Sequence, residues 1–159
     1  MKKIVLLVAL FATAFTKNSF AQDSTQQAQL SQLLSHYYGM KDALVAGDAA
    51  MASSKGEAFM KTLNDIDPKI ISETTSSALL KDAGAITESK DIKSQRQHFS
   101  GFSDKMFALA KTLKLTKDPV YQQYCPMKKA YWLSNEKAIR NPYYGNAMLT
   151  CGRVTETLQ

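Results

Sequence analysis

The sequence predicts an all-α protein: an up-down four-helix bundle with an irregular C-terminal tail, made of a short strand and turns, packed on it. Three observations support this prediction. Apolar residues recur every three or four positions from about Ser24 to Leu115, which is the period of an amphipathic helix. Glycine, proline and capping residues divide this stretch into four segments with short connections, which favour antiparallel neighbours. At Asp118-Pro119 the helical period stops.

The first two helices are separated by a clear break. The inward face of the first is formed by Leu30, Leu33, Leu34, Tyr37, Leu44 and Val45, with Met40 or Lys41. Gly47 suits the position just after a helix, and Asp48 suits the N-cap of the next one. The second helix is expected to bury Met51, Ala52, Phe59, Leu63 and Ile66.

The third and fourth helices differ in the strength of their signals. Asp67 followed by Pro68 predicts the start of the third helix, and Gly84 is a candidate for its early end. The fourth helix, from about Asp91, has the clearest apolar stripe of all. That stripe is formed by Phe99, Phe102, Met106, Leu109 and Leu113.

The C-terminal tail, residues 118–159, has a different character. It holds both cysteines and the only tryptophan, and it offers one short strand, Val120 to Tyr124. Because it is too short for a core of its own, we expect it to pack on residues 24–115 within a single domain, 22–159. The expected contacts are Tyr121, Tyr124, Trp132, Tyr143 and Tyr144.

The first 21 residues are expected to be a signal peptide. Lys2 and Lys3 precede an apolar run that is too short to span a bilayer, and Ser19 and Ala21 suit a signal peptidase. Cleavage after Ala21 lowers the formal net charge from +6 to +3, because three lysines and no acid are lost. The expected product is periplasmic or secreted, without membrane insertion. It has no basic run typical of nucleic-acid binding.

Four sulfur residues form the main functional hypothesis. Cys125 and Met127 flank Pro126, and Met148 and Cys151 are three positions apart. Thiolate and thioether ligands select Cu(I) or Ag(I), whereas zinc does not ordinarily take methionine. If the two pairs converge, they form a soft-metal site, with His98 on the fourth helix as an additional candidate ligand.

A structural disulfide is the competing interpretation of the same residues. Two cysteines in an exported chain favour a Cys125–Cys151 bridge, which would contribute roughly 3–4 kcal/mol by loop closure. The methionines would then fill the core. In that case the chain is a non-enzymatic interaction module, with Trp132, Tyr143 and Tyr144 as the expected docking surface. An enzyme is not expected, because the sequence contains no catalytic motif.

The motifs of the tail resemble one family of exported bacterial domains of unknown function. They are YCPM from Tyr124, WLS from Trp132, NPYYG ending at Gly145, and ML-x-CG ending at Gly152. The helical part also fits, since YYGMKDALVAGDAAMA and QRQHFSGFSDKMFALAK resemble the family's first helices and its QR-x-x-F-x-x-x-S helix.

This resemblance implies an all-helical domain associated with heavy-metal handling. Members of the family occur alone after signal peptides, and also fused to periplasmic adaptor proteins of copper and silver efflux systems. A periplasmic efflux adaptor is therefore the expected partner, and Cu(I) or Ag(I) the expected ligand. One departure concerns the Cys-Pro-Met motif, which often continues with histidine, whereas here Lys128 and Lys129 follow.

Overall fold

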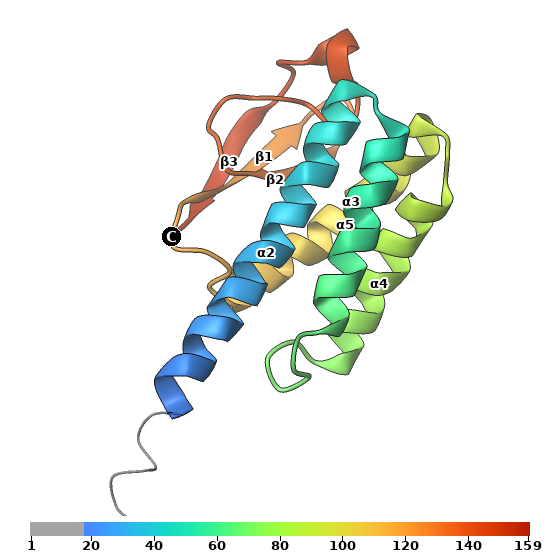
Figure 1. Ribbon diagram of the computed structural model, residues 1–159. Helices are drawn as coiled ribbons and strands as arrows, with labels where there is room; N and C mark the ends of the chain where they lie inside the picture. Colours follow the sequence, from blue (N-terminus) through green and yellow to red (C-terminus); the bar gives the residue numbers. More distant parts are fainter. Residues whose placement is uncertain (1–17) are drawn as a thin grey trace, which may run out of the picture.

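Four helices dominate the computed structural model, which describes residues 18–159 (Figure 1). Their bounds are α2 Asn18–Ala46, α3 Ala49–Asn64, α4 Glu73–Glu88 and α5 Ile92–Thr112. The four helices predicted from periodicity are thus confirmed. Most of the expected signal peptide, as far as residue 17, lies outside the described residues.

Side-chain caps set the starts of α3, α4 and α5. The side chain of Asp48 accepts a hydrogen bond from Met51 N at 2.9 Å and begins α3. Asp91 begins α5 in the same way, through Ser94 N at 2.9 Å. The sequence predicted the cap at Asp48 and a helix start near Asp91, and Gly47 turns the chain between α2 and α3 with φ 77°.

The start predicted for the third helix is wrong. Asp67 accepts a hydrogen bond from Lys69 N at 2.8 Å and closes a local turn, and α4 begins only after Ser72, whose Oγ accepts from Thr75 N at 3.3 Å. An aspartate can make such a turn without a helix following it. The expected early end at Gly84 is also wrong, because α4 continues to Glu88.

The C-terminal region is more regular than predicted. It forms a three-stranded antiparallel sheet of β1 Val120–Cys125, β2 Ala130–Ser134 and β3 Arg153–Leu158, with β1 in the centre. Only β1 was expected as a strand. A short 3-10 helix, η1 Gly145–Met148, lies in the connection between β2 and β3. The protein is therefore mainly helical with a small sheet, and the all-α prediction was too narrow.

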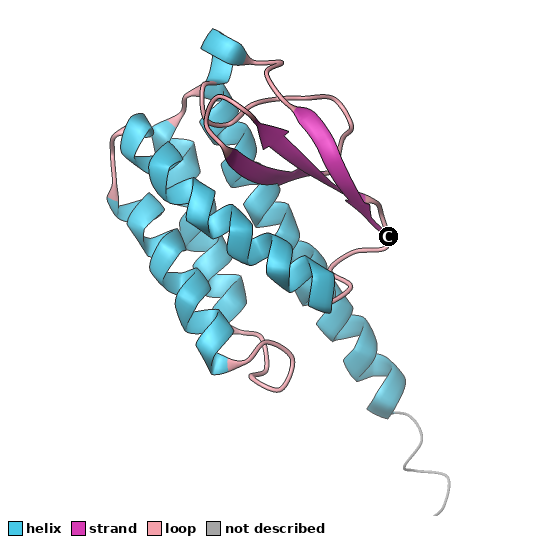
Figure 2. Ribbon diagram, turned by 180° about the vertical axis from the view of Figure 1, so that it is seen from behind, coloured by secondary structure: helices cyan, strands magenta, loops and turns pink. Residues whose placement is uncertain are grey.

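The helices and the sheet share one core. Each helix packs mainly on its neighbour in the chain, and α5 also packs against β2 (Figure 2). The largest fully buried side chains come from both parts of the fold: Tyr37, Phe59, Phe99 and Phe102 from the helices and Trp132 from the sheet. Packing on the helices therefore holds the sheet in place.

Candidate metal centre

The two cysteines come together although they are 26 positions apart. Cys125 ends β1, and Cys151 lies between η1 and β3. Their Sγ atoms are 4.0 Å apart, and both residues are free thiols in this structure. The tertiary fold, which places the segment after η1 beside the end of β1, creates this proximity.

The turn around Cys125 is tightly hydrogen-bonded. The thiol of Cys125 is fully buried and accepts the backbone N–H of Lys128 at 3.4 Å. Lys129 N donates to the Cys125 carbonyl at 2.8 Å, and Lys129 has a positive φ of 55°. Lys128 and Lys129 therefore help to hold the turn through their backbone.

The segment around Cys151 is held by Asn141, which is fully buried. Asn141 Nδ2 donates to the carbonyl of Cys151 at 2.8 Å, and Asn141 N donates to the carbonyl of Leu149 at 2.8 Å. Its Oδ1 accepts from Tyr143 N at 2.8 Å. One asparagine thus connects the NPYYG loop to the segment that carries the second cysteine.

Both methionines flank Cys151 through the backbone. Cys151 N donates to the carbonyl of Met148 at 3.1 Å, and the backbone of Met127 hydrogen-bonds to the Cys151 thiol. Their side chains reach solvent, with 63% of Met127 and 38% of Met148 exposed. The expectation that these methionines fill the core is therefore wrong, whereas exposed thioethers are free to turn toward a bound ion.

Desolvation raises the pKa of the Cys151 thiol above its ordinary value. The hydrogen bond with Cys125 and the charge of that neighbouring thiol act in the same direction, and the backbone of Met127 opposes them. A pair of close thiols resists double ionisation because the two thiolates repel each other. A bound cation would remove that repulsion.

His98 does not join the two cysteines. It is exposed on α5. Within residues 18–159, no group of three or more histidine, cysteine or acidic side chains is placed to hold a metal ion. A site at the cysteines therefore has two thiols and the neighbouring thioethers as its donors.

The aromatic docking surface predicted from the tail is not present. Trp132 is fully buried and Tyr143 is 5% exposed, because their rings pack against each other and Tyr143 also packs against Phe99 of α5. Only Tyr144 is partly exposed. The expected contact with the helices is confirmed for Tyr143. The prediction that Trp132 and Tyr143 form a docking surface is wrong.

The residues of the QR-x-x-F-x-x-x-S pattern in α5 have structural contacts. Gln95 Nε2 lies 2.8–3.2 Å from the carbonyl oxygens of Ala49, Ile86 and Ser89. Arg96 Nη2 donates to the carbonyl of Leu44 at 2.7 Å, at the end of α2.

Phe99 belongs to the core, and the Ser103 hydroxyl is 2.7 Å from Tyr37 Oη. The pattern is visible in the sequence, but these contacts are not. The buried polar residues Gln95 and Asn141 were missed because nothing local shows that they are buried.

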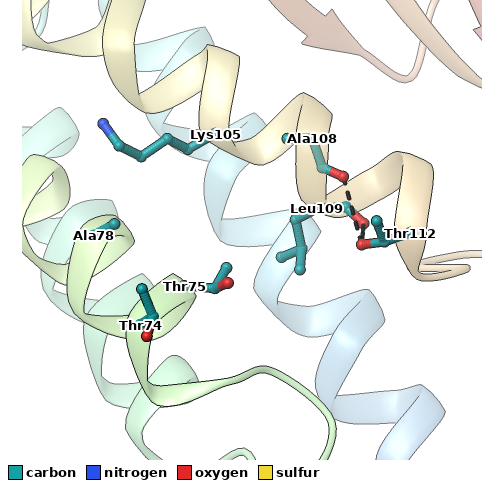
Figure 3. Close-up of a pocket in the computed structure, with 7 residues that line it drawn as sticks. All are labelled: Thr74, Thr75, Ala78, Lys105, Ala108, Leu109 and Thr112. Atoms are coloured by element: carbon teal, nitrogen blue, oxygen red, sulfur yellow. Dashed lines mark hydrogen bonds between the residues drawn. The ribbon is translucent and has the colours of Figure 1, made fainter.

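A separate apolar cavity of about 370 Å³ lies between α4 and α5 (Figure 3). It is lined by Thr74, Thr75, Ala78, Lys105, Ala108, Leu109 and Thr112. Lys105 is its one titratable residue, and its ammonium is paired with Asp82 at 2.5 Å. The lining residues therefore provide no acid–base pair.

No helix in the part of the chain that the structure describes is long and apolar enough to cross a membrane.

No curated protein and no solved structure matches the chain. A family described as Protein of unknown function (DUF3347) matches residues 33–118, which is more than half of the chain. The match runs from within α2 to the loop after α5 and stops before β1, so both cysteines lie beyond it. The chain belongs to this family of proteins of unknown function.

Proposed function

We propose that this protein is an exported domain that binds a soft metal ion, Cu(I) or Ag(I), and acts as a periplasmic accessory of heavy-metal efflux. The observation that carries the proposal is the 4.0 Å separation of Cys125 Sγ and Cys151 Sγ. An ion with metal–sulfur bonds of about 2.3 Å separates two thiolates by about 3.8 Å in tetrahedral and about 4.6 Å in linear geometry. The two thiols fall within this range.

The donor chemistry supports the same ligand. Two thiolates with thioethers nearby suit Cu(I) and Ag(I) better than zinc. Met127 and Met148 are each in backbone contact with Cys151, and each has an exposed side chain. We therefore assign Cys125 and Cys151 as thiolate ligands and the two methionines as thioether ligands. His98 is left out of the set.

The other residues of the tail motifs have contacts that explain them. Trp132 and Tyr143 are core residues, and Asn141 holds the loop. Gly152 has φ 155°, and a Cβ there would lie 2.8 Å from the Trp132 ring. Cys125 belongs to the core and Cys151 packs against it, so the same packing brings the two thiols together. This proximity supports a chemical role for the pair.

Titration of the purified, reduced protein with Cu(I) against a competing chelator tests the proposal. Mutation of a residue that only hydrogen-bonds to a metal ligand typically lowers metal affinity about 10–100-fold. We expect Cys125→Ser and Cys151→Ser each to lower the Cu(I) affinity by more than this. Met127→Leu and Met148→Leu should lose less, and His98→Ala, as the control, should bind as the wild type does. Wild-type affinity in both cysteine variants would contradict the site.

A disulfide is the second candidate for the same pair. To form it, the sulfurs must approach by about 2 Å, to the usual bond length of about 2.05 Å. Non-reducing intact mass of the protein isolated from the periplasm distinguishes the two. A mass lower by two hydrogens that persists in mild reductant would show a stable Cys125–Cys151 disulfide. The protein would then be a non-enzymatic module with a structural bridge. A start at Gln22 in the same spectrum would support export.

The expected partner is a periplasmic adaptor of an efflux system. The two proteins would pass the metal ion from one to the other. Mixing the Cu(I)-loaded protein with a purified adaptor, followed by separation and metal analysis, tests this part independently. Retention of all copper by this protein over a range of adaptor concentrations would argue against transfer while leaving the metal site intact.

A further inference from the structure

A second cavity, of about 400 Å³, lies where α5 meets the NPYYG loop and the turn after β1. Its lining residues are Lys93, Arg96, Gln97, Lys128, Tyr143, Tyr144 and Ala147. Three of them are cationic and none is acidic. The volume lies within the range of small-molecule sites, about 300–1,000 Å³.

No acidic side chain among the described residues is paired with the positive charges of this cavity. Among the described residues, the ion pairs involve Lys41, Lys105 and Lys111. Lys93, Arg96 and Lys128 have no acidic partner there. The three cations repel one another when they are held around one cavity. An anion in the cavity would be attracted to all three and would reduce this repulsion.

The arginine is held rigidly in this position. Its Nη2 donates to the Leu44 carbonyl at 2.7 Å, while its Nε is buried without a hydrogen-bond partner among the described residues. Gly145, with φ 54°, lets the NPYYG loop approach the Arg96 guanidinium closely, since a Cβ at this position would lie 2.6 Å from Arg96 Nη2. Burial lowers the pKa of Arg96, as expected for a cation without a counter-ion.

The aromatic side of the cavity is also preformed. Tyr143 is nearly buried, packs against Phe99 and Trp132, and donates its hydroxyl to the carbonyl of Tyr131. A ring held in this way provides a fixed wall, and the partly exposed Tyr144 lies beside it in the lining. The ligand therefore meets rigid groups on the helix and on the loop.

We propose that this cavity binds a small oxyanion, namely a phosphate or a carboxylate group, through Arg96, Lys93 and Lys128. Guanidinium and ammonium groups bind such oxygens by charge-assisted hydrogen bonds. The inference does not rest on metal binding. Lys128 belongs to the same turn as Cys125, but the cavity and the thiol pair have no lining side chain in common with each other.

NMR titration of the reduced, chelator-treated protein with inorganic phosphate and, separately, with succinate tests the proposal at constant ionic strength. We expect saturable shifts of the backbone amides of Gln97, Lys128 and Ala147 with at least one probe. The probe that saturates at the lower concentration identifies the preferred group. Absence of saturation with both probes would overturn the proposal.

Paired variants separate a defined site from general surface charge. The double variant Lys93→Ala/Lys128→Ala should weaken binding by about tenfold or more, because two charge-assisted contacts are lost. The control Lys69→Ala/Lys117→Ala removes the same charge from two exposed lysines outside the cavity and should leave the affinity unchanged. Equal weakening in both double variants would also overturn the proposal.

Discussion

The hydroxyl of Tyr37 accepts a hydrogen bond from the backbone N–H of Leu133 at 3.0 Å, deep in the core. Tyr37 lies on α2 and Leu133 on β2, 96 positions later in the chain. The same hydroxyl is 2.7 Å from Ser103 Oγ on α5. One phenol thus connects two helices to the sheet, and burial raises its pKa well above the ordinary value, so that it remains protonated.

Replacement of this hydroxyl should cost stability. Tyr37→Phe leaves the Leu133 N–H buried without its partner, and we expect a loss of about 1–3 kcal/mol in the free energy of unfolding, measured in urea. Tyr38→Phe is a matched control, because the buried Tyr38 hydroxyl has no hydrogen-bond partner among the described residues. A similar loss in both variants would show that the hydroxyl contact is not the cause.

A carboxyl group at position 95 should make stability depend on pH. Gln95 is fully buried, and its amide donates toward carbonyl oxygens at the ends of α3 and α4. In Gln95→Glu, burial among carbonyl oxygens raises the carboxyl pKa in the folded state above its unfolded value near about 4.3. The folded state then binds the proton more tightly than the unfolded state does. Stability therefore falls as the pH rises from the unfolded-state pKa to the folded-state pKa of this carboxyl group.

Thermal unfolding between pH 4 and pH 8 measures this effect. Gln32→Glu is the control, because Gln32 is exposed on α2 and lies outside the cationic cavity. We expect the control to follow the wild type across the pH range, while Gln95→Glu becomes progressively less stable above about pH 4.3. A constant difference between the two variants at all pH values would contradict the burial of the introduced carboxyl group.

The close approach of Gly152 to the core should not tolerate a side chain. A Cβ at this position would lie 2.8 Å from Trp132 and 3.0 Å from the carbonyl oxygen of Tyr124, at φ 155°. We expect Gly152→Ala to destabilise the protein by about 1–3 kcal/mol through overpacking. Gly84→Ala, in the helix α4 with a nearest neighbour at 3.9 Å, should instead stabilise it by up to about 1 kcal/mol.

The two thiols should differ in reactivity toward a maleimide. Cys151 is partly exposed and Cys125 fully buried, so mass spectrometry should find the label first on Cys151. Because the pKa of Cys151 is raised, its thiolate fraction is small at neutral pH, and the rate should rise about tenfold per pH unit below that pKa. Faster labelling of Cys125 would show that the turn opens in solution.

Cu(I) binding at this pair should strengthen with pH. Binding to thiols releases protons, and the raised pKa of Cys151 keeps its proton bound at neutral pH. The apparent association constant should therefore rise by about tenfold per pH unit for each proton released. Titrations at pH 6, 7 and 8 measure the slope, and a slope of zero would indicate ligands other than the two thiols.

The helical part of the fold was predictable because its signals are local. The periodic apolar residues and the caps act within one or two turns of the chain, so the cap at Asp48, the helix start at Asp91 and most of the apolar residues lie where expected. Asp67 was misread because an aspartate that closes a turn and one that caps a helix have the same sequence signal. Met51 was expected in the core but is 47% exposed, since helical period alone does not set the edge of a buried face.

The sheet and the aromatic residues were less predictable because their partners are distant in sequence. The register of β1 with β3 joins Val120 to Leu158, and no local pattern encodes such a pairing. Trp132 and Tyr143 were expected to contact the helices and, in the disulfide interpretation, to form a docking surface, because exposed aromatic residues often anchor interfaces. The helices instead bury both rings.

The sequence alone determined the four helices, most of their ends and the identity of the sulfur residues, because residue chemistry and short-range hydrogen bonds suffice for these. Only the tertiary structure decided that Cys125 and Cys151 lie 4.0 Å apart, that His98 is separate, and that three cations surround one cavity. The physical reason is that distances between remote residues depend on how the sheet packs against α5, and packing is a property of the whole core.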